Sequence, residues 1–146
     1  MVFTMSHVLP GLLIRHANGM DKQIISTTLA PSAIGPYSQA VRSGEWIFVS
    51  GQIPIDPSTG QLIDDKSIAG QTRRVLQNLL AIVDAAGGSV DNVVKTTVFL
   101  QRMGDFAEMN RVYSEFFTSS QPARSTIEAA RLPRDVLVEI DCIAVI

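Results

Sequence analysis

The residues best suited to chemistry lie near the C-terminus, where two acids interrupt an apolar segment. Residues 136–146 read Val-Leu-Val-Glu-Ile-Asp-Cys-Ile-Ala-Val-Ile, a β-branched run that is typical of a buried strand. Because side chains alternate along a strand, Glu139 and Asp141 share one face. The other face is wholly apolar and is predicted to face the core. The face with the acids is therefore expected to be an interface, a pocket, or both.

The preceding segment carries Arg124, which shares a strand face with Thr126 and Glu128. A turn at residues 132–135 predicts a hairpin between the two strands, with the arginine and the acids on one polar face. An unpaired buried charge is costly, so Arg124 is either in a structural ion pair or a bidentate clamp for a carboxylate. Glu139 is either its ion-pair partner or a proton-transfer group. Its pKa would be raised by desolvation and lowered by arginine.

Two other positions present polar groups beside unusual backbone. Tyr37 follows Gly35-Pro36, which places a hydroxyl on a rigid loop, although a lone tyrosine is more often a packing residue. Ser50-Gly51 would let a backbone amide approach a ligand closely, and a β-bulge explains the same pair equally well. Both interpretations of each position stay open at this stage.

The motifs of many enzyme classes are missing. Both histidines lie within residues 1–19, so the rest of the chain has no Ser-His-Asp triad and no histidine-based metal cluster. The glycines form no phosphate-binding loop. The single cysteine, Cys142, falls on the apolar strand face and is predicted to be a buried hydrophobe rather than a reactive thiol. We therefore expect no metal and no cofactor.

The bulk composition narrows the function classes further. A chain of 146 residues fits one domain, and its 46% hydrophobic content is high for a soluble monomer of this size. Part of the apolar surface is therefore predicted to lie in a subunit interface. The formal net charge of -2 argues against nucleic acid as a partner, because phosphate contacts need clustered Lys and Arg. No apolar run approaches the ~20 residues of a membrane span.

Hydrophobic periodicity predicts the elements that position these residues. Strands are predicted at residues 23–27, 38–42, 46–50 and 93–100 and in the C-terminal hairpin, with helices at 66–86 and 105–117. This order predicts an α+β fold with two helices on one face of a mixed sheet. A partner subunit is the economical cover for the other face.

Residues 1–19 differ from the rest of the chain because they contain no acid. They are interpreted either as a mitochondrial transit peptide or as an extension ahead of the functional start. Residues 20–146 are predicted to be one domain. The protein is then expected to be cytoplasmic, or mitochondrial if the first segment acts as a transit peptide.

An ordered set of motifs across residues 20–146 resembles the RidA/YjgF family of imine deaminases. The motifs are Ala33–Gln39, Val49–Pro54, Val94–Phe99, Pro122–Ser125, Ala130–Pro133 and Val138–Ile140. The resemblance implies a homotrimer of chorismate-mutase-like α+β subunits. Their sheets would form a central barrel, with helices outside and three sites in the clefts between subunits.

The resemblance also implies an activity, the hydrolysis of 2-imino or enamine acids to 2-keto acids and ammonia without cofactor or metal. By position, Arg124 would bind the substrate carboxylate and Glu139 would position or activate the attacking water. Tyr37 and Asn110 would line the pocket, and Ser50-Gly51 would contact the substrate.

The chain departs from the family pattern at Thr126, where many relatives have a cysteine. A role that needs a thiol is therefore lost, whereas a substrate-binding hydroxyl remains. Two other functions stay open from the sequence: a non-catalytic trimer that binds a 2-keto acid, and an endoribonuclease or translation inhibitor. The acidic charge balance disfavours the last of these.

Overall fold

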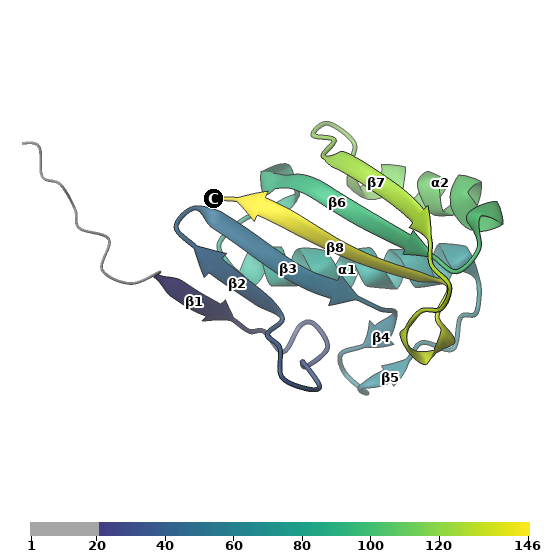
Figure 1. Ribbon diagram of the computed structural model, residues 1–146, viewed down its shortest axis with the longest axis horizontal. Helices are drawn as coiled ribbons and strands as arrows, with labels where there is room; N and C mark the ends of the chain where they lie inside the picture. The colour runs from purple at the N-terminus through teal and green to yellow at the C-terminus, as the bar shows by residue number, and fades with distance from the viewer. Residues whose placement is uncertain (1–20) are drawn as a thin grey trace, which may run out of the picture.

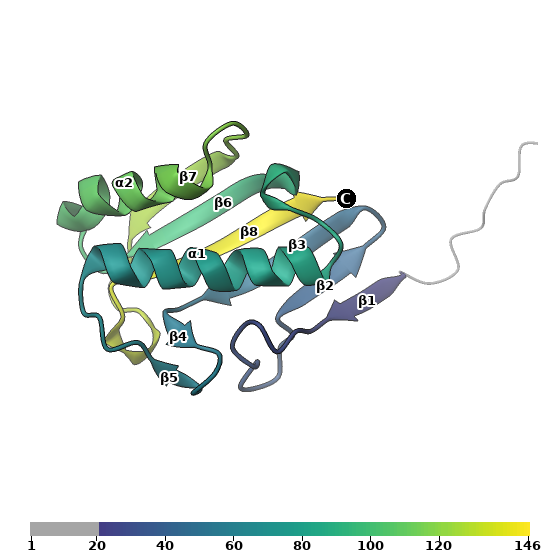
Figure 2. The same cartoon turned by 180° about the vertical axis from the view of Figure 1, so that it is seen from behind.

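The computed structural model describes residues 21–146, so the predictions for residues 1–19 lie outside the described residues. Six strands form one mixed sheet with two helices against one of its faces (Figures 1 and 2). The strand order is β1-β2-β3-β8-β6-β7, and only β6 and β7 are parallel neighbours. The strands are β1 (Lys22–Ile25), β2 (Ala40–Ser43), β3 (Trp46–Gln52), β6 (Val93–Leu100), β7 (Ala123–Glu128) and β8 (Val138–Val145). The predicted α+β class is confirmed.

The two helices begin and end close to where the sequence predicts them. Helix α1 spans Ile68–Ala85 and α2 spans Phe106–Phe116. The hydroxyl of Ser67 caps α1 by accepting from the Gly70 N–H at 3.0 Å, which satisfies one of the free donors of the first turn. After α1 the chain turns at Gly87, whose φ of 93° favours glycine.

A short hairpin projects from the end of β3. It consists of β4 (Ile55–Asp56) and β5 (Gln61–Leu62). The buried Asn78 of α1 ties this hairpin to the helix layer, because its Nδ2 donates to the carbonyls of Ile53 at 3.3 Å and Ile55 at 2.9 Å. Backbone that would otherwise lie in a loose loop is thereby held against the domain.

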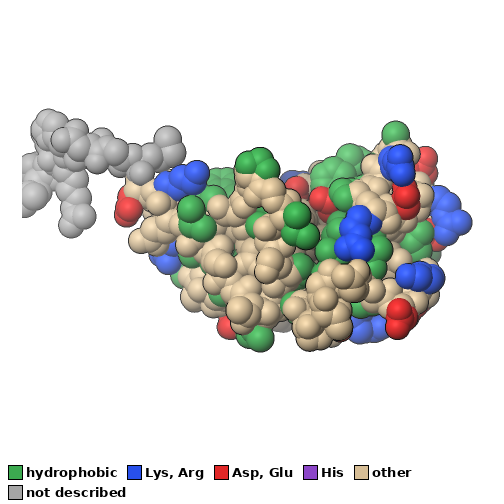
Figure 3. Space-filling model, turned by 90° about the horizontal axis from the view of Figure 1, so that it is seen from below, with side chains coloured by type: hydrophobic (Ala, Val, Ile, Leu, Met, Phe, Trp, Pro, Cys, Tyr) green, Lys and Arg blue, Asp and Glu red, His purple; other side chains and the backbone are tan. Residues whose placement is uncertain are grey.

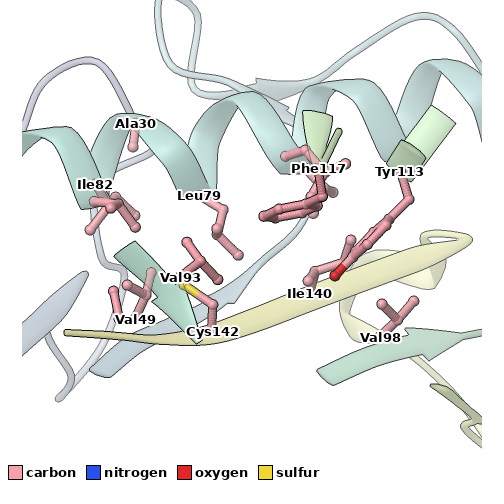
Figure 4. Packing of buried hydrophobic residues seen from close by; sticks show 14 of the residues in the cluster. Ala30, Val49, Leu79, Ile82, Val93, Val98, Tyr113, Phe117, Ile140 and Cys142 are labelled. Atoms are coloured by element: carbon pink, nitrogen blue, oxygen red, sulfur yellow. The ribbon is translucent and has the colours of Figure 1, made fainter. Parts of the chain in front are cut away.

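The core lies between the helices and the sheet (Figure 4). Val75, Leu79 and Ile82 of α1 are fully buried above Ile140 and Cys142 of β8. Burial raises the pKa of the Cys142 thiol to about 12, which keeps it protonated at neutral pH. The prediction of a buried, unreactive cysteine is confirmed. None of the helices within residues 21–146 has the length and apolarity to cross a membrane.

The predicted C-terminal hairpin is wrong. Strand β8 pairs with β3 and β6, whereas β7 is an edge strand beside β6. Two physical reasons explain this topology. A nearly continuous apolar strand is best buried at the centre of a sheet, with neighbours on both edges. Helix α2 also connects β6 to β7 as a crossover, which is the connection that parallel neighbours need.

The prediction of one polar face for Arg124 and Glu139 is therefore wrong as well. Arg124 lies opposite Thr96, and Glu139 lies opposite Phe99. Side chains of directly paired residues share a face, and positions 96 and 99 of one strand point to opposite faces. Arg124 is on the face that the helices cover, and Glu139 is on the open face.

The open face of the sheet is strongly apolar. Trp46 and Phe48 are 51% and 48% exposed there, and they lie opposite Val145 and Ile143 of β8. Ile127 of β7 is exposed as well. A contiguous apolar face without a covering layer is typical of an interaction surface. The subunit interface stays a prediction, and the exposed apolar residues of this face are consistent with it.

Candidate active site

Arg124 is held by aromatic rings rather than by acids. Its guanidinium carbon lies 4.6 Å from the ring centroid of Tyr113 and 5.6 Å from that of Phe106. Tyr113 is itself oriented, because its hydroxyl shares a 2.7 Å hydrogen bond with the buried Thr96 Oγ1. Figure 4 shows its ring reaching from α2 to the sheet. Stacking on two rings fixes the guanidinium plane without using up its N–H donors.

No carboxylate within residues 21–146 lies within ion-pair distance of Arg124. Glu128, its neighbour on β7, instead accepts a 2.7 Å hydrogen bond from the Met103 N–H. The interpretation of Arg124 as one half of a structural ion pair is therefore wrong within a single chain. The guanidinium is left with donors for a ligand.

Arg124 faces a cavity of about 350 Å³, which we call the Arg124 pocket. It is lined by Asn110, Tyr113, Ser114, Phe117, Gln121, Pro122 and Arg124. The pocket brings Asn110 and Arg124 together, as the family resemblance implies. Thr126 shares the face of β7 with Arg124, because it lies opposite the buried Val98. Sequence reasoning missed Phe106 and Tyr113; their seven-residue spacing on one helix face was the available signal.

Glu139 faces a different cavity of about 430 Å³, which we call the Glu139 pocket. It is lined by Ile34, Tyr37, Ser50, Gly51, Ile53, Pro133 and Glu139. Four of the predicted site residues therefore meet here, although they come from a loop and from two strands. The seven predicted site residues thus divide between two separate places in one chain.

Gly51 provides the space for the carboxylate of Glu139. The register of β3 against β8 shifts between Val49 and Gln52, so the bulge is present. A Cβ added at Gly51 would collide with Glu139 Oε1. Ser50 has a structural task, since its hydroxyl donates to the Ser38 carbonyl at 2.6 Å. The group that approaches the Gly51 backbone closely is therefore the Glu139 carboxylate of the protein itself.

Tyr37 lines the Glu139 pocket and is 53% exposed. The hydroxyl oxygen accepts from the Ile34 N–H at 3.3 Å, so its own hydrogen stays available to a ligand. The Tyr37 N–H donates to the Gly35 carbonyl at 2.9 Å, which makes the loop a tight turn. The rigid loop predicted from Gly35-Pro36 is present.

Burial raises the pKa of Glu139, and the negative charge of Asp141 on the same strand face adds to this effect. The lowering by Arg124 that the sequence suggested is absent, because the two residues lie on opposite faces. A carboxylate with a raised pKa is a stronger base toward a water molecule. Within residues 21–146, no three potential ligands among His, Cys, Asp and Glu lie together as a metal site requires.

Glu139→Gln is expected to raise the melting temperature at neutral pH. A raised folded-state pKa means that stability is greatest below the ordinary value of 4.5 and is lost as the pH rises through the folded value. The charged carboxylate therefore destabilises the fold at pH 7, and glutamine removes that cost. Thermal unfolding of both proteins at pH 7 and pH 4 checks this. A gain of equal size at both pH values would contradict the assigned cause.

Gly51→Ala is expected to lower catalytic efficiency by about a hundredfold, because displacing a catalytic group by about 1 Å has a cost of this order. The new methyl group would push the Glu139 carboxylate from its place. Gly104→Ala is the matched control, since a Cβ there meets nothing within 4 Å. Steady-state rates and melting curves of both variants separate lost activity from lost folding. Equal rates for both variants would show that the contact is unimportant.

Comparison with known proteins shows which family the chain belongs to. The model of the family described as Endoribonuclease L-PSP matches residues 27–146. The chain belongs to this family, which is the YjgF/RidA family. The resemblance drawn from the motifs is thereby confirmed.

Relatives in this family share about half of their residues with the chain. A RutC family protein of Pyrococcus horikoshii is 54% identical over 123 residues, which cover 84% of this chain and 97% of that protein. The 2-iminobutanoate/2-iminopropanoate deaminase of Escherichia coli is 52% identical over 124 residues, with coverages of 83% and 95%. The crystal structure of E. coli TdcF with bound serine matches with a TM-score of 0.80 at 48% identity, covering 85% and 98%.

Proposed function

We propose that the protein hydrolyses 2-imino acids and their enamine tautomers to 2-keto acids and ammonia. The observation that carries the proposal is the guanidinium of Arg124, which is stacked on two rings and has no acidic partner within residues 21–146. A planar fork in this state is suited to a substrate carboxylate. The name of the E. coli deaminase and the serine bound to TdcF support a small carboxylate ligand.

We further propose that each site is formed by two copies of the chain. Arg124 and Glu139 lie on opposite faces of the sheet, so one small molecule cannot contact both within a single chain. The open apolar face offers a surface on which a second copy can dock. A closed ring of three copies, as the family resemblance implies, would repeat the same contact three times.

The proposed reaction begins with the carboxylate of the imino acid on Arg124, which places C2 near Glu139. A water molecule attacks C2, the C=N electron pair moves to the nitrogen, and Glu139 accepts a proton from the water. The nitrogen takes a proton from solvent water, which gives an amino alcohol. Glu139 then passes its proton to the nitrogen, ammonia leaves as the hydroxyl oxygen forms the C=O bond, and the hydroxyl proton returns to solvent, which yields the 2-keto acid. In this proposal Tyr37, whose hydroxyl hydrogen is not used by the Ile34 contact, donates a hydrogen bond to the new hydroxyl group.

The test is to generate 2-iminobutanoate from threonine with a dehydratase and to follow its decay with and without the protein. We expect faster decay and a matching release of ammonia. An unchanged decay rate together with tight binding of 2-oxobutanoate would favour a binding protein instead.

Cleavage of RNA is the second activity to assay, because the family model is described as an endoribonuclease. On the face seen in Figure 3, acidic side chains are interspersed among the basic ones, without a continuous basic patch. A formal net charge of -2 also leaves little attraction for phosphates. We therefore expect no cleavage. If the protein does cleave RNA and the Arg124→Ala variant does not, the site that contains Arg124 acts on RNA.

A further inference from the structure

A third cavity of about 270 Å³ lies beside the Glu139 pocket, and we call it the side-chain pocket. It is lined by Pro31, Ser32, Ile34, Tyr37, Gln39, Gly51, Gln52, Ile53, Ile55, Pro133 and Arg134. Five of these residues also line the Glu139 pocket: Ile34, Tyr37, Gly51, Ile53 and Pro133. The two cavities therefore adjoin along these five residues, with the Glu139 carboxylate packed against Gly51 at their boundary.

The walls of the side-chain pocket are fixed by the fold. Asn78 holds one wall through its hydrogen bonds to the carbonyls of Ile53 and Ile55. The lining also contains Arg134, whose φ of 56° is uncommon for a residue other than glycine. Arg131 and Asp135 bracket this turn with hydrogen bonds of 2.7 and 3.1 Å. A backbone held in a sparsely populated conformation beside a cavity indicates a functional constraint.

Gln52 brings an unpartnered acceptor to this pocket. Its side chain is 6% exposed, and its Nε2 donates to the Ser50 carbonyl at 3.1 Å. Its Oε1 accepts no hydrogen bond from the described residues, and this atom keeps some exposure to solvent. The neighbouring Gln39 differs, because its Oε1 accepts from the Thr27 N–H at 2.7 Å. An accessible amide oxygen that the protein leaves free can accept a hydrogen bond from a ligand with an N–H or O–H donor.

Resting on the proposed function, we infer that this pocket binds the side chain of the imino acid. With C2 beside Glu139, a substituent on C3 can pass over Gly51 between Tyr37 and Pro133. A water molecule or a group of similar size, such as a methylene, occupies roughly 30 Å³, so the cavity has room for about nine non-hydrogen atoms of a substrate side chain. The preferred substrates are then 2-imino acids whose side chains have three or more non-hydrogen atoms and end in a methyl group or a hydroxyl donor, ahead of shorter ones such as 2-iminobutanoate.

Binding of 2-keto acids to the full chain, measured by calorimetry, tests this subsite. Each buried methylene strengthens binding by about fourfold, so 2-oxopentanoate should bind at least about tenfold more tightly than pyruvate. Ile55→Phe fills the pocket from a wall that the Glu139 pocket does not share, and it should reduce that ratio to about threefold or less. Ser32→Leu is a second filling variant at an exposed position, in case the first fails to fold. An unchanged ratio in the folded variants would overturn the subsite.

Two closely matched ligands test whether Gln52 accepts a hydrogen bond from the substrate side chain. 4-Hydroxy-2-oxobutanoate and 2-oxopentanoate differ only in a terminal hydroxyl in place of a methyl group. We expect Gln52→Leu to shift their affinity ratio by about tenfold in favour of the methyl compound, because the hydroxyl loses its acceptor. A ratio within about twofold of the wild-type value would exclude Gln52 from ligand binding.

Turnover of the corresponding imines separates this inference from the proposed function. If the keto acids bind with the expected preferences but no imine is hydrolysed, the subsite stands and the hydrolase proposal fails. If all imines are hydrolysed with ratios that the filling variants do not change, the hydrolase stands and the subsite fails. Absence of both binding and turnover would overturn both.

Discussion

Arg124→Ala is expected to lower kcat/KM for 2-iminobutanoate by about a thousandfold, which corresponds to the loss of two charge-assisted hydrogen bonds to the substrate carboxylate. The residue does not support the fold through an ion pair, so folding should be nearly unaffected. The measurement is the initial rate of imine decay over a range of imine concentrations, with melting curves as the check on folding.

Two further variants sharpen the interpretation of this loss. Arg124→Lys keeps the charge but not the planar fork, so we expect an intermediate loss of about tenfold or more. Arg102→Ala removes an arginine whose side chain is 68% exposed and paired with Asp105, and it should leave the rate unchanged. A rate for Arg124→Ala within threefold of wild type would remove Arg124 from the site.

Mixing two inactive variants is expected to restore activity if each site needs two copies of the chain. The Arg124→Ala variant keeps an intact Glu139 pocket, and the Glu139→Gln variant keeps an intact Arg124 pocket, so each variant supplies what the other lacks. When equal amounts assemble at random into a closed ring, about one quarter of the clefts combine an intact Arg124 with an intact Glu139. Co-expressed protein should therefore show about a quarter of the wild-type rate.

The control for this experiment is to mix the two purified variants without allowing subunit exchange, which should restore nothing. Size-exclusion chromatography with light scattering gives the number of copies in the active species. A rate for the co-expressed protein that equals the mean of the two parents would mean that both residues act within one chain, against the geometry of the sheet. An active species that is monomeric would also show that both residues act within one chain.

The local elements could be predicted from the sequence because local signals specify them. The 3-and-4 spacing of apolar residues in α1 and the β-branched runs of β6 and β8 are properties of neighbouring residues. The burial of Cys142 followed from alternation within one strand. The β4–β5 hairpin was not predicted as strands, since two-residue strands leave almost no periodic signal.

Strand pairing could not be predicted in the same way, because it depends on contacts between distant segments. The turn at residues 132–135 suggested that β7 and β8 are partners, yet β6 lies between them. This error in pairing placed Arg124 and Glu139 on one face. The cation–π contacts of Arg124 with Tyr113 and Phe106 depend on the same packing: the helical spacing puts the two rings on one face of α2, but it does not indicate that Arg124 of β7 packs against them.

The sequence by itself determined which groups this protein has for chemistry: an arginine, an acid in an apolar strand, a tyrosine on a rigid loop, and no histidine outside residues 1–19. Its ordered motifs also determined the family. Only the tertiary structure decided how these groups are distributed. Register and sheet order place Arg124 on the helix-covered face and Glu139 on the open face. The physical reason is that a residue's neighbours along the chain set which way its side chain points, whereas strand order sets which side chains meet.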